Sequence, residues 1–246
     1  MSFVDIHSHL LPGLDDGAPD LGTALEMARI ALKQGVSHCI CTPHIEPGRF
    51  DNTKGSIASS LALFKKALKE HGIDLVVAAA AEVHFGLEVI SGIQKDEVPF
   101  LGRWQGMNVM LLELPHGHVP YGAEDLTKWL IANNVVPLIA HPERNRGFIK
   151  QPSRLDVFLQ QGCLAQVTAA SFFGRFGESA QILAEELARE SKITVIASDA
   201  HSIEKRPPLF LDALEHIEKI AGEAAAEQWM VKNPWTIAES LFSSTR

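Results

Sequence analysis

Residues 1–17 read MSFVDIHSHLLPGLDDG, a stretch in which a short apolar run leads directly into two histidines. The run Phe3–Ile6 is typical of a buried β-strand, and it ends at His7 and His9. Because alternate residues of a strand share one face, the two imidazoles can converge on one cation. An isolated His-x-His is a weak motif, so the prediction of a metal site depends on partners elsewhere in the chain.

Further apolar runs end in the same way, each at a residue that can bind a metal. The last of them, residues 193–197, leads to Asp199 and His201, which again share a face. Three runs between the two ends of the chain finish at a Glu or a His. With residues that follow the first two strands, the candidate ligands are His7, His9, Asp16, His44, Glu82, Glu113, His141, Asp199 and His201.

The order of the apolar runs predicts the fold. They alternate with helix-like segments, which is the pattern of a parallel α/β domain. The expected strands are Phe3–Ile6, His38–Cys41, Leu75–Ala81, Val109–Leu112, Val135–Ala140, Leu164–Val167 and Ile193–Ala197. The expected helices are Asp20–Gln34, Ser56–Glu70, Ala123–Ala132, Ser153–Gln161, Glu178–Glu190, Leu209–Ile220, Ala224–Val231 and Thr236–Phe242, with Asp20 and Asn233 as caps. Seven strands, with ligands at their C-terminal ends, predict a barrel-like single domain over residues 1–246.

Composition excludes several classes of function. The chain has 22 Lys and Arg against 30 Asp and Glu, a net charge of -8, which disfavours binding to nucleic acid or to anionic membranes. Asp5 and His7 interrupt any signal-peptide core, and no apolar run is long enough for a membrane span, so we expect a cytoplasmic protein without membrane insertion. Cys39, Cys41 and Cys163 do not begin a Cys-x5-Arg loop, which argues against cysteine-dependent phosphatase chemistry.

The candidate ligands themselves indicate the reaction class. Nine side chains exceed the three or four that one ion takes, so two or three ions are expected, with a carboxylate such as Glu82 bridging. Imidazoles and carboxylates without thiolates suit Mn²⁺, Fe²⁺, Zn²⁺ or a related ion. Such sites polarise a phosphoryl or carbonyl oxygen and lower the pKa of bound water toward ~7, which predicts hydrolysis. Arg144 and Arg206 are the best placed residues to clamp an anionic substrate.

Several other polar and aromatic residues lie near the predicted strand ends. His116 and His118 have ligand spacing but lie among Pro and Gly in a predicted loop, so we expect them to face substrate or solvent. Thr168 ends the sixth strand and is a candidate substrate contact. Phe172, Phe173 and Phe176 are expected either to pack under a loop or to line an aromatic entrance. Packing under a loop is the commoner explanation for such aromatic residues.

The motifs as an ordered set resemble a known family. VDIHSHLLPGLDDG, CTPH, AAEVH, LLELP, AHPERN, QVTAASFFGRFG and ASDAH followed by RPP are similar to motifs of the PHP (polymerase and histidinol phosphatase) superfamily. Within it, the chain resembles the bacterial capsular and exopolysaccharide protein-tyrosine phosphatases, a metal-dependent class. The resemblance extends from Asp5 to the Asn233–Pro234 region. It implies a distorted (βα)7-type TIM-like barrel and a trinuclear, often manganese-dependent site.

The resemblance also implies a role for each candidate residue. It assigns one ion to His7, His9, Glu82 and Asp199, with Glu82 bridging, a second to Glu82, Glu113 and His141, and a third to Asp16, His44 and His201. Arg144 and Arg206 match the phosphate-binding arginines of the family, and with Asp199 they form the implied catalytic set. The loop after His44, IEPGRF, is less basic than in some members.

The implied activity is hydrolysis of phosphotyrosine on the C-terminal tail of a cognate bacterial tyrosine kinase that controls capsular or exopolysaccharide synthesis. Mn²⁺ is the first expectation for the metal, with Fe²⁺, Zn²⁺ or Mg²⁺ as alternatives. One competing hypothesis is a histidinol-phosphate or other small-phosphomonoester phosphatase with the same metals. A non-enzymatic alternative is a metal-stabilised regulatory scaffold that binds a kinase without turnover.

Overall fold

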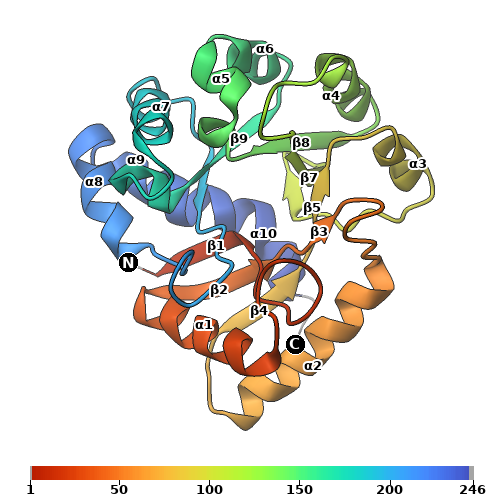
Figure 1. The fold of residues 1–246 in the computed structure, drawn as a ribbon, viewed down its shortest axis with the longest axis vertical. Helices are drawn as coiled ribbons and strands as arrows, with labels where there is room; N and C mark the ends of the chain where they lie inside the picture. The colour runs from red at the N-terminus through yellow and green to blue at the C-terminus, as the bar shows by residue number, and fades with distance from the viewer. Residues whose placement is uncertain (1, 244–246) are drawn as a thin grey trace.

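The computed structural model describes residues 2–243 as a ring of parallel strands surrounded by helices (Figure 1). The strands are β1 (Phe3–Ser8), β2 (Val36–Cys41), β3 (His44–Ile45), β4 (Val76–Ala79), β5 (Glu82–His84), β6 (Gly102–Trp104), β7 (Met107–Glu113), β8 (Val135–Ala140), β9 (Leu164–Thr168) and β10 (Val195–Ala197). The helices are α1 (Leu21–Lys33), α2 (Lys54–Glu70), α3 (Glu88–Gln94), α4 (Ala123–Ala132), α5 (Arg146–Lys150), α6 (Arg154–Gln160), α7 (Glu178–Arg189), α8 (Leu211–Ala221), α9 (Glu223–Glu227) and α10 (Asn233–Ser243). Each of the seven predicted strands overlaps a strand of the structure.

The strands form a distorted barrel, as predicted. One sheet has the order β1-β2-β4, and a second has the order β10-β9-β8-β7-β5-β3, with the short strand β6 paired antiparallel to β7. β3 continues the direction of β2 after a break at Thr42–Pro43, and β5 continues β4 in the same way. The ring closes where β1 meets β10, through a parallel bridge between Ser8 and Ala200. The distortion therefore lies in the two broken strands and in this closure.

Two apolar cores lie on either side of the barrel wall. The inner core includes Val4 and Ile6 of β1 and Val109 of β7. The outer core packs the helices on the barrel and includes Phe3 of β1. Neighbouring residues of β1 therefore belong to different cores, which is the alternation expected for a strand with one face inside the barrel.

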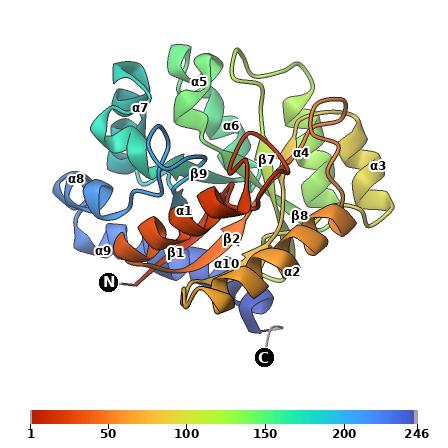
Figure 2. The ribbon, with the colours of Figure 1, turned by 60° about the horizontal axis from the view of Figure 1, so that its bottom comes forward.

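Helix α10 closes the barrel at the end opposite the candidate site (Figure 2). Its residues Ile237, Ala238 and Phe242 complete the inner core. Gly102 of β6 lies against this helix so closely that a Cβ there would be 1.9 Å from the carbonyl oxygen of Ile237, and only glycine avoids the clash. No helix among residues 2–243 is both long and apolar enough to cross a membrane.

The helix boundaries agree with the sequence pattern where capping is local. Asp20 accepts a hydrogen bond from the Thr23 amide and caps α1 as predicted. α2 begins at Lys54, two residues before the predicted start, because Thr53 and Ser56 form a reciprocal capping box. The predicted cap at Asn233 is wrong: its backbone is helical (φ −65°, ψ −48°), and its side chain donates to the Thr194 carbonyl instead. A π-helical segment, Gln228–Lys232, leads directly from α9 into α10.

Candidate metal centre

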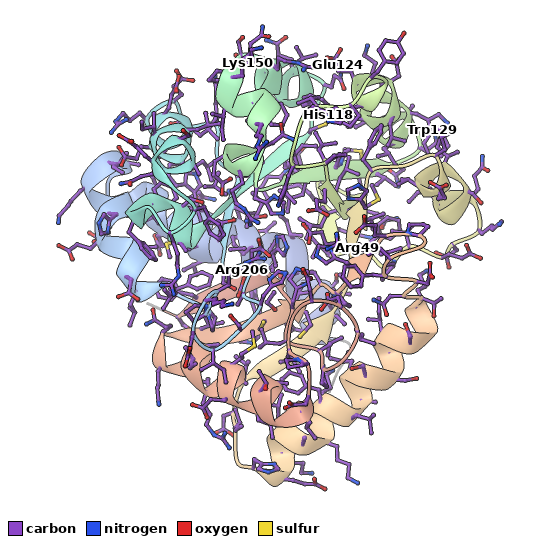
Figure 3. All side chains as sticks on the ribbon, viewed as in Figure 1. Arg49, His118, Glu124, Trp129, Lys150 and Arg206 are labelled. Carbon is purple, nitrogen blue, oxygen red and sulfur yellow. The ribbon has the colours of Figure 1, made fainter. Side chains whose placement is uncertain are left out.

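The nine predicted ligands come together at the C-terminal mouth of the barrel, beside Arg206, which is labelled in Figure 3. Parallel strands direct their C-terminal ends to one face, so ligands far apart in sequence become neighbours. In β1 the pairing with β2 is irregular: Asp5 pairs with Cys39 and Ser8 pairs with Cys41, so β1 has one more residue than β2 between these two pairs. This extra residue shifts the inside–outside alternation within the segment that contains His7.

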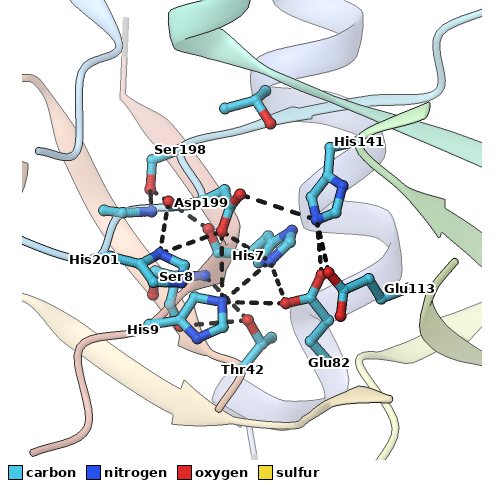
Figure 4. Close-up of polar contacts among 12 residues, drawn as sticks. His7, Ser8, His9, Thr42, Glu82, Glu113, His141, Ser198, Asp199 and His201 are labelled. Carbon is cyan, nitrogen blue, oxygen red and sulfur yellow. Dashed lines mark hydrogen bonds and ion pairs between the residues drawn. The ribbon is translucent and has the colours of Figure 1, made fainter. Parts of the chain in front are cut away.

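The first group consists of His7, His9, Glu82 and Asp199, all buried (Figure 4). Nε2 of His7 lies 3.2 Å from Oε2 of Glu82 and 3.3 Å from Oδ1 of Asp199. Nε2 of His9 lies 3.3 Å and 3.5 Å from the same two oxygens. Atoms that each lie about 2.1 Å from one ion are about 3.0–3.5 Å apart. The four ligand atoms are therefore spaced as the corners of one coordination shell.

Buried polar atoms in this group and at the neighbouring His44 lack hydrogen-bond partners, which tests whether cations fit. Within residues 2–243, Oε2 of Glu82, Oδ1 of Asp199 and Nδ1 of His44 are buried and have no hydrogen-bond partner. Leaving a buried charged oxygen without a partner costs at least about 1–3 kcal/mol. Divalent cations among these atoms would satisfy all three, so the donor set fits metal ions.

A second group joins Asp16, His44 and His201 to His9. Oδ1 of Asp16 lies 3.4 Å from Nε2 of His44 and 3.5 Å from Nε2 of His201. Asp16 is the exposed member, with a side chain 48% accessible, whereas the three histidines are buried. This group therefore lies at the solvent side of the site.

The third group is built around His141. Its Nε2 lies 2.9 Å from Oε1 of Glu82 and 3.9 Å from Oε1 of Glu113, and His116 is close enough to complete a set of three with Glu113 and His141. The other oxygen of Glu82, Oε2, faces His7, His9 and, at 3.1 Å, Nδ1 of His44. Glu82 thus directs its two oxygens toward different histidines, the geometry that a bridging carboxylate requires.

Two arginines complete the wall of the pocket. The pocket has a volume of about 300 Å³, and its lining includes Glu82, His116, Arg144 and Arg206. Nη1 of Arg144 and, at 2.5 Å, Nη2 of Arg206 both bind Oδ2 of Asp199. The ring of Phe176 covers both guanidinium groups, with centroid distances of 4.3 Å and 5.7 Å. The two cations are therefore held at the same side of the mouth.

A layer of hydrogen bonds behind the ligands fixes the imidazole rings. Oδ2 of Asp15 lies 2.7 Å from Nδ1 of His9, and Oε1 of Gln166 lies 2.8 Å from Nδ1 of His7. Both acceptors leave the Nε2 atoms free to face the carboxylates. Gly17 lies directly against His9, where a Cβ would be 2.3 Å from the His9 carbonyl oxygen. In the sequence Asp-Asp-Gly, Asp15 therefore orients the His9 ring, Asp16 is a candidate ligand, and Gly17 is the residue that fits against His9 without a clash.

Two of the candidate residues have unusual backbone conformations. His141 has φ 32° and Asp199 has φ 50°, in the left-handed region. Non-glycine residues rarely adopt these values, and such strain is concentrated at functional sites. Both residues follow the end of a barrel strand, and the reversal directs the chain into the loop that carries Arg144 or Arg206.

The charges at the site shift several pKa values. Burial favours neutral His7, but the carboxylates of Glu82 and Asp199 outweigh it and raise the pKa of His7. Burial opposes ionisation of Asp199, but His7 and the two arginines hold its pKa well below the usual range. Burial, aided by the charge of His9, lowers the pKa of His201 to about 4, and burial also lowers the pKa of His116. His201 and His116 are thus neutral at pH 7, the form that can bind a metal.

Some residues at the site depart from expectation. His116 lines the pocket as a member of the third group, whereas His118 does not line it. Thr168 is not a substrate contact, because it is fully buried outside the pocket lining and its amide donates to Glu143. Arg49, in the loop after His44, lines the pocket and was not predicted to. The sequence signal for Arg49 was its place as the one cation in a loop that directly follows the candidate ligand His44.

The chain is similar in sequence to a described protein family and to named relatives. A family model described as capsular polysaccharide synthesis, CpsB/CapC, matches residues 3–239. Tyrosine-protein phosphatase YwqE of Bacillus subtilis (strain 168) is 35% identical, with 89% of this chain and 85% of that protein covered. The putative tyrosine-protein phosphatase CapC of Staphylococcus aureus is 32% identical, with coverage of 83% and 79%.

Solved structures with a similar fold include a tyrosine phosphatase of the same kind. One matching crystal structure comes from a study of YwqE from Bacillus subtilis and CpsB from Streptococcus pneumoniae, described as unique metal-dependent tyrosine phosphatases. The match has a TM-score of 0.85 at 32% identity and covers 99% of this chain and 95% of that one. The phosphotriesterase homology protein of Escherichia coli matches with a TM-score of 0.59 at 13% identity, covering 96% and 98%. The second likeness shows the shared barrel fold alone.

Proposed function

This chain belongs to the capsular polysaccharide synthesis CpsB/CapC family, and from that membership we propose that it is a metal-dependent protein-tyrosine phosphatase. The resemblance predicted from the ordered motifs is confirmed by the family model and by the named relatives. The proposal treats residues 1–246 as one phosphatase domain, in agreement with a family match that spans residues 3–239.

One observation carries the proposal: Glu82 faces different imidazoles with its two oxygens, beside a pair of arginines that meet at Asp199. Bound divalent ions would polarise a phosphoryl oxygen and lower the pKa of water. The ligand sets we assign are His7, His9, Glu82 and Asp199 for one ion, Glu82, Glu113 and His141 for a second, and Asp16, His44 and His201 for a third. Two or three ions are expected, Mn²⁺ first, with Fe²⁺, Zn²⁺ or Mg²⁺ as alternatives.

The arginines supply the substrate side of the chemistry. Arg144 and Arg206 bind one carboxylate oxygen together, so both guanidinium groups are already directed to one anionic point. A phosphate that enters the 300 Å³ pocket can take donors from the same two groups, which neutralise charge on the transferring phosphoryl group. Asp199 links the arginines to the first ligand group and keeps them in place. This is the role that we assign to the three residues in catalysis.

Phosphotyrosine suits this pocket chemically. A phenolate has a conjugate acid with a pKa of ~10 and leaves more easily than an alkoxide, so the pocket needs no strong general acid. The proposed substrate is phosphotyrosine on the tail of a cognate bacterial tyrosine kinase, whose dephosphorylation regulates capsular or exopolysaccharide synthesis. The family description and the names of the relatives support this proposal. Three free, buried cysteines are in keeping with a reducing cytoplasm, where such a tail would lie.

The experiment compares substrate classes on protein of defined metal content. The chain is stripped with a chelator, reloaded with Mn²⁺, and assayed on a phosphotyrosine peptide and on histidinol phosphate. We expect activity that disappears on chelation, returns with metal, and favours the peptide by at least about tenfold in kcat/KM. A preference for histidinol phosphate would overturn the substrate, and full activity of metal-free protein would overturn the mechanism.

The scaffold alternative is separated by variants. Asp199→Ala and His9→Ala remove ligands of the first group and should abolish phosphate release. If cells that carry these variants still regulate polysaccharide synthesis normally, the scaffold hypothesis is favoured over the enzyme.

A further inference from the structure

A second hollow opens directly from the metal pocket. It has a volume of about 560 Å³ and shares two lining residues, His116 and Arg144, with the pocket. Beyond them it is lined by Arg146, Ile149, Phe176 and the first residues of α7. We call it the flank groove. A substrate bound at Arg144 that is longer than a phosphotyrosine side chain has a path into this groove past His116.

The wall of the flank groove is held in place by backbone contacts. The side-chain amide of Asn145, which is buried, donates to the carbonyl oxygens of Pro115 at 2.8 Å and His118 at 3.1 Å. The Arg146 amide donates to the His116 carbonyl at 2.9 Å. These three bonds fasten the loop after β7 to the loop after β8. The groove is therefore a built feature of the fold.

Close packing between the same loops reinforces this wall. A Cβ at Gly147 would lie only 2.8 Å from the backbone nitrogen of Val119, so the two segments approach as closely as a glycine permits. Arg146 is the residue before this contact, and Asn145, the residue before that, caps α5 by accepting from the Gly147 and Phe148 amides. The Cα of Arg146 is thus fixed although its side chain is exposed.

The charge of Arg146 has no internal partner. Within residues 2–243 its guanidinium makes neither an ion pair nor a hydrogen bond, whereas Arg144 is bound to Asp199 and stacked on Phe176. The chain as a whole carries a net charge of -8, and Arg146 places an unpaired positive charge beside the pocket. Glu178 is the one carboxylate that lines the groove. The groove therefore offers a positive side chain to whatever leaves the pocket.

We propose that the flank groove binds an acidic side chain of the phosphopeptide next to its phosphotyrosine, and that Arg146 determines this preference. The inference rests on the proposed function, because it takes the phosphate to lie at Arg144. The phosphotyrosine occupies the metal pocket, the peptide backbone passes between His116 and Phe176, and a carboxylate of the neighbouring sequence pairs with Arg146. Because Arg146 is exposed, the pair contributes a preference of about threefold to fivefold, which weakens at high salt.

The test uses matched phosphotyrosine peptides that differ only in Glu against Gln at one position, scanned over the three residues on each side. For the metal-loaded wild type we expect at least one position on one side at which Glu raises kcat/KM about threefold or more over Gln. Arg146→Gln should bring this ratio close to 1, and Arg146→Glu should reverse it in favour of the Gln peptide. Lys150→Gln is the control, since Lys150 is an exposed cation of the same helix that does not line the groove (Figure 3) and should keep the wild-type ratio.

A binding measurement keeps this inference separate from the proposed function. The same peptides with a non-hydrolysable phosphonate in place of the phosphate are titrated into the metal-loaded protein, with fluorescence anisotropy as the readout. If Glu peptides bind more tightly than Gln peptides in a way that depends on Arg146, but no phosphopeptide is hydrolysed, the proposed function is overturned and the role of the flank groove in binding is supported. Hydrolysis with equal rates and affinities for all Glu and Gln peptides, or an unchanged preference in Arg146→Gln, would overturn the role of the groove.

Discussion

The hydroxyl of Ser198 donates a 2.6 Å hydrogen bond to Oδ2 of Asp5, which joins the first strand of the barrel to the last. The Ser198 amide donates to the other oxygen of Asp5 at 3.0 Å, and the Ala200 amide donates to the Ser198 hydroxyl at 3.1 Å. Both residues are buried. Since His7 and Asp199 are close in sequence to this pair, the barrel closes immediately beneath the first ligand group.

Asp5→Ala should therefore destabilise the fold and weaken the metal site together. The change leaves the Ser198 hydroxyl and amide without their buried acceptor, and we expect the free energy of unfolding to fall by about 2–4 kcal/mol. Ser198→Ala keeps the hydrogen bond from the residue 198 amide to Asp5, so it should lower the free energy of unfolding by about half as much. Urea unfolding of the metal-free proteins measures the free energy of unfolding of both variants. Losses below about 0.5 kcal/mol in Asp5→Ala would contradict the view that this pair closes the barrel.

Glu82→Gln should reduce metal content and activity far more than its small change in shape suggests. The amide retains one acceptor oxygen but loses the charge that faces His7 on one side and His141 on the other. We expect at least one metal equivalent to be lost and kcat to fall about 100-fold or more, measured by elemental analysis and hydrolysis of p-nitrophenyl phosphate. Glu88→Gln, which alters an exposed carboxylate of α3, is the matched control. Full metal content in Glu82→Gln would refute a bridging role.

Gln166→Leu tests the layer behind the ligands. Oε1 of Gln166 accepts from Nδ1 of His7 and from the His141 amide, so it sets the tautomer of one ring and the position of the other. Losing such a partner lowers metal affinity by about 10–100-fold. Competition with a chelating dye gives the affinity, and Gln151→Leu, at an exposed position, should leave it unchanged. Equal affinities for both variants would show that the ring of His7 needs no such support.

The sequence predicts the barrel well because each predicted strand is an apolar run that alternates with helix-like segments. It also brings the ligands to the correct mouth, since every run ends at a polar residue and parallel strands share a direction. Asp15 and Gln166 are harder to predict. Asp15 is adjacent to the candidate ligand Asp16, and only tertiary contact shows that Asp15 supports His9 whereas Asp16 faces His44 and His201. Gln166 lies within β9, far in sequence from every candidate ligand, and only the folded barrel brings it to His7.

Local irregularities account for most of what was not predicted. The extra residue of β1 before Ser8 and the breaks after Cys41 and Ala79 are irregularities of strand pairing, which the pattern of apolar residues does not reveal. The left-handed backbone of Asp199 has the same origin, because its amide donates to the His7 carbonyl across the seam of the barrel. The role of Asn233 was missed for a similar reason: a contact with Thr194 replaces the expected cap.

Acid should destabilise the protein partly through His38, at the end of the barrel opposite the metal site. Burial lowers the pKa of His38, whose ring packs edge-on against Trp235 and Phe242 of α10. The unfolded chain takes up this proton near pH ~6.5 and the folded protein only at lower pH, so the free energy of unfolding is unaffected above that value and falls as the pH drops below it. We expect His38→Gln to lose less stability than the wild type between pH 7.5 and 5.5, measured by urea unfolding of the metal-free proteins. Because the site histidines are the same in both, their contribution cancels in the comparison. Equal losses would show that His38 accepts its proton as readily in the folded protein as in the unfolded chain.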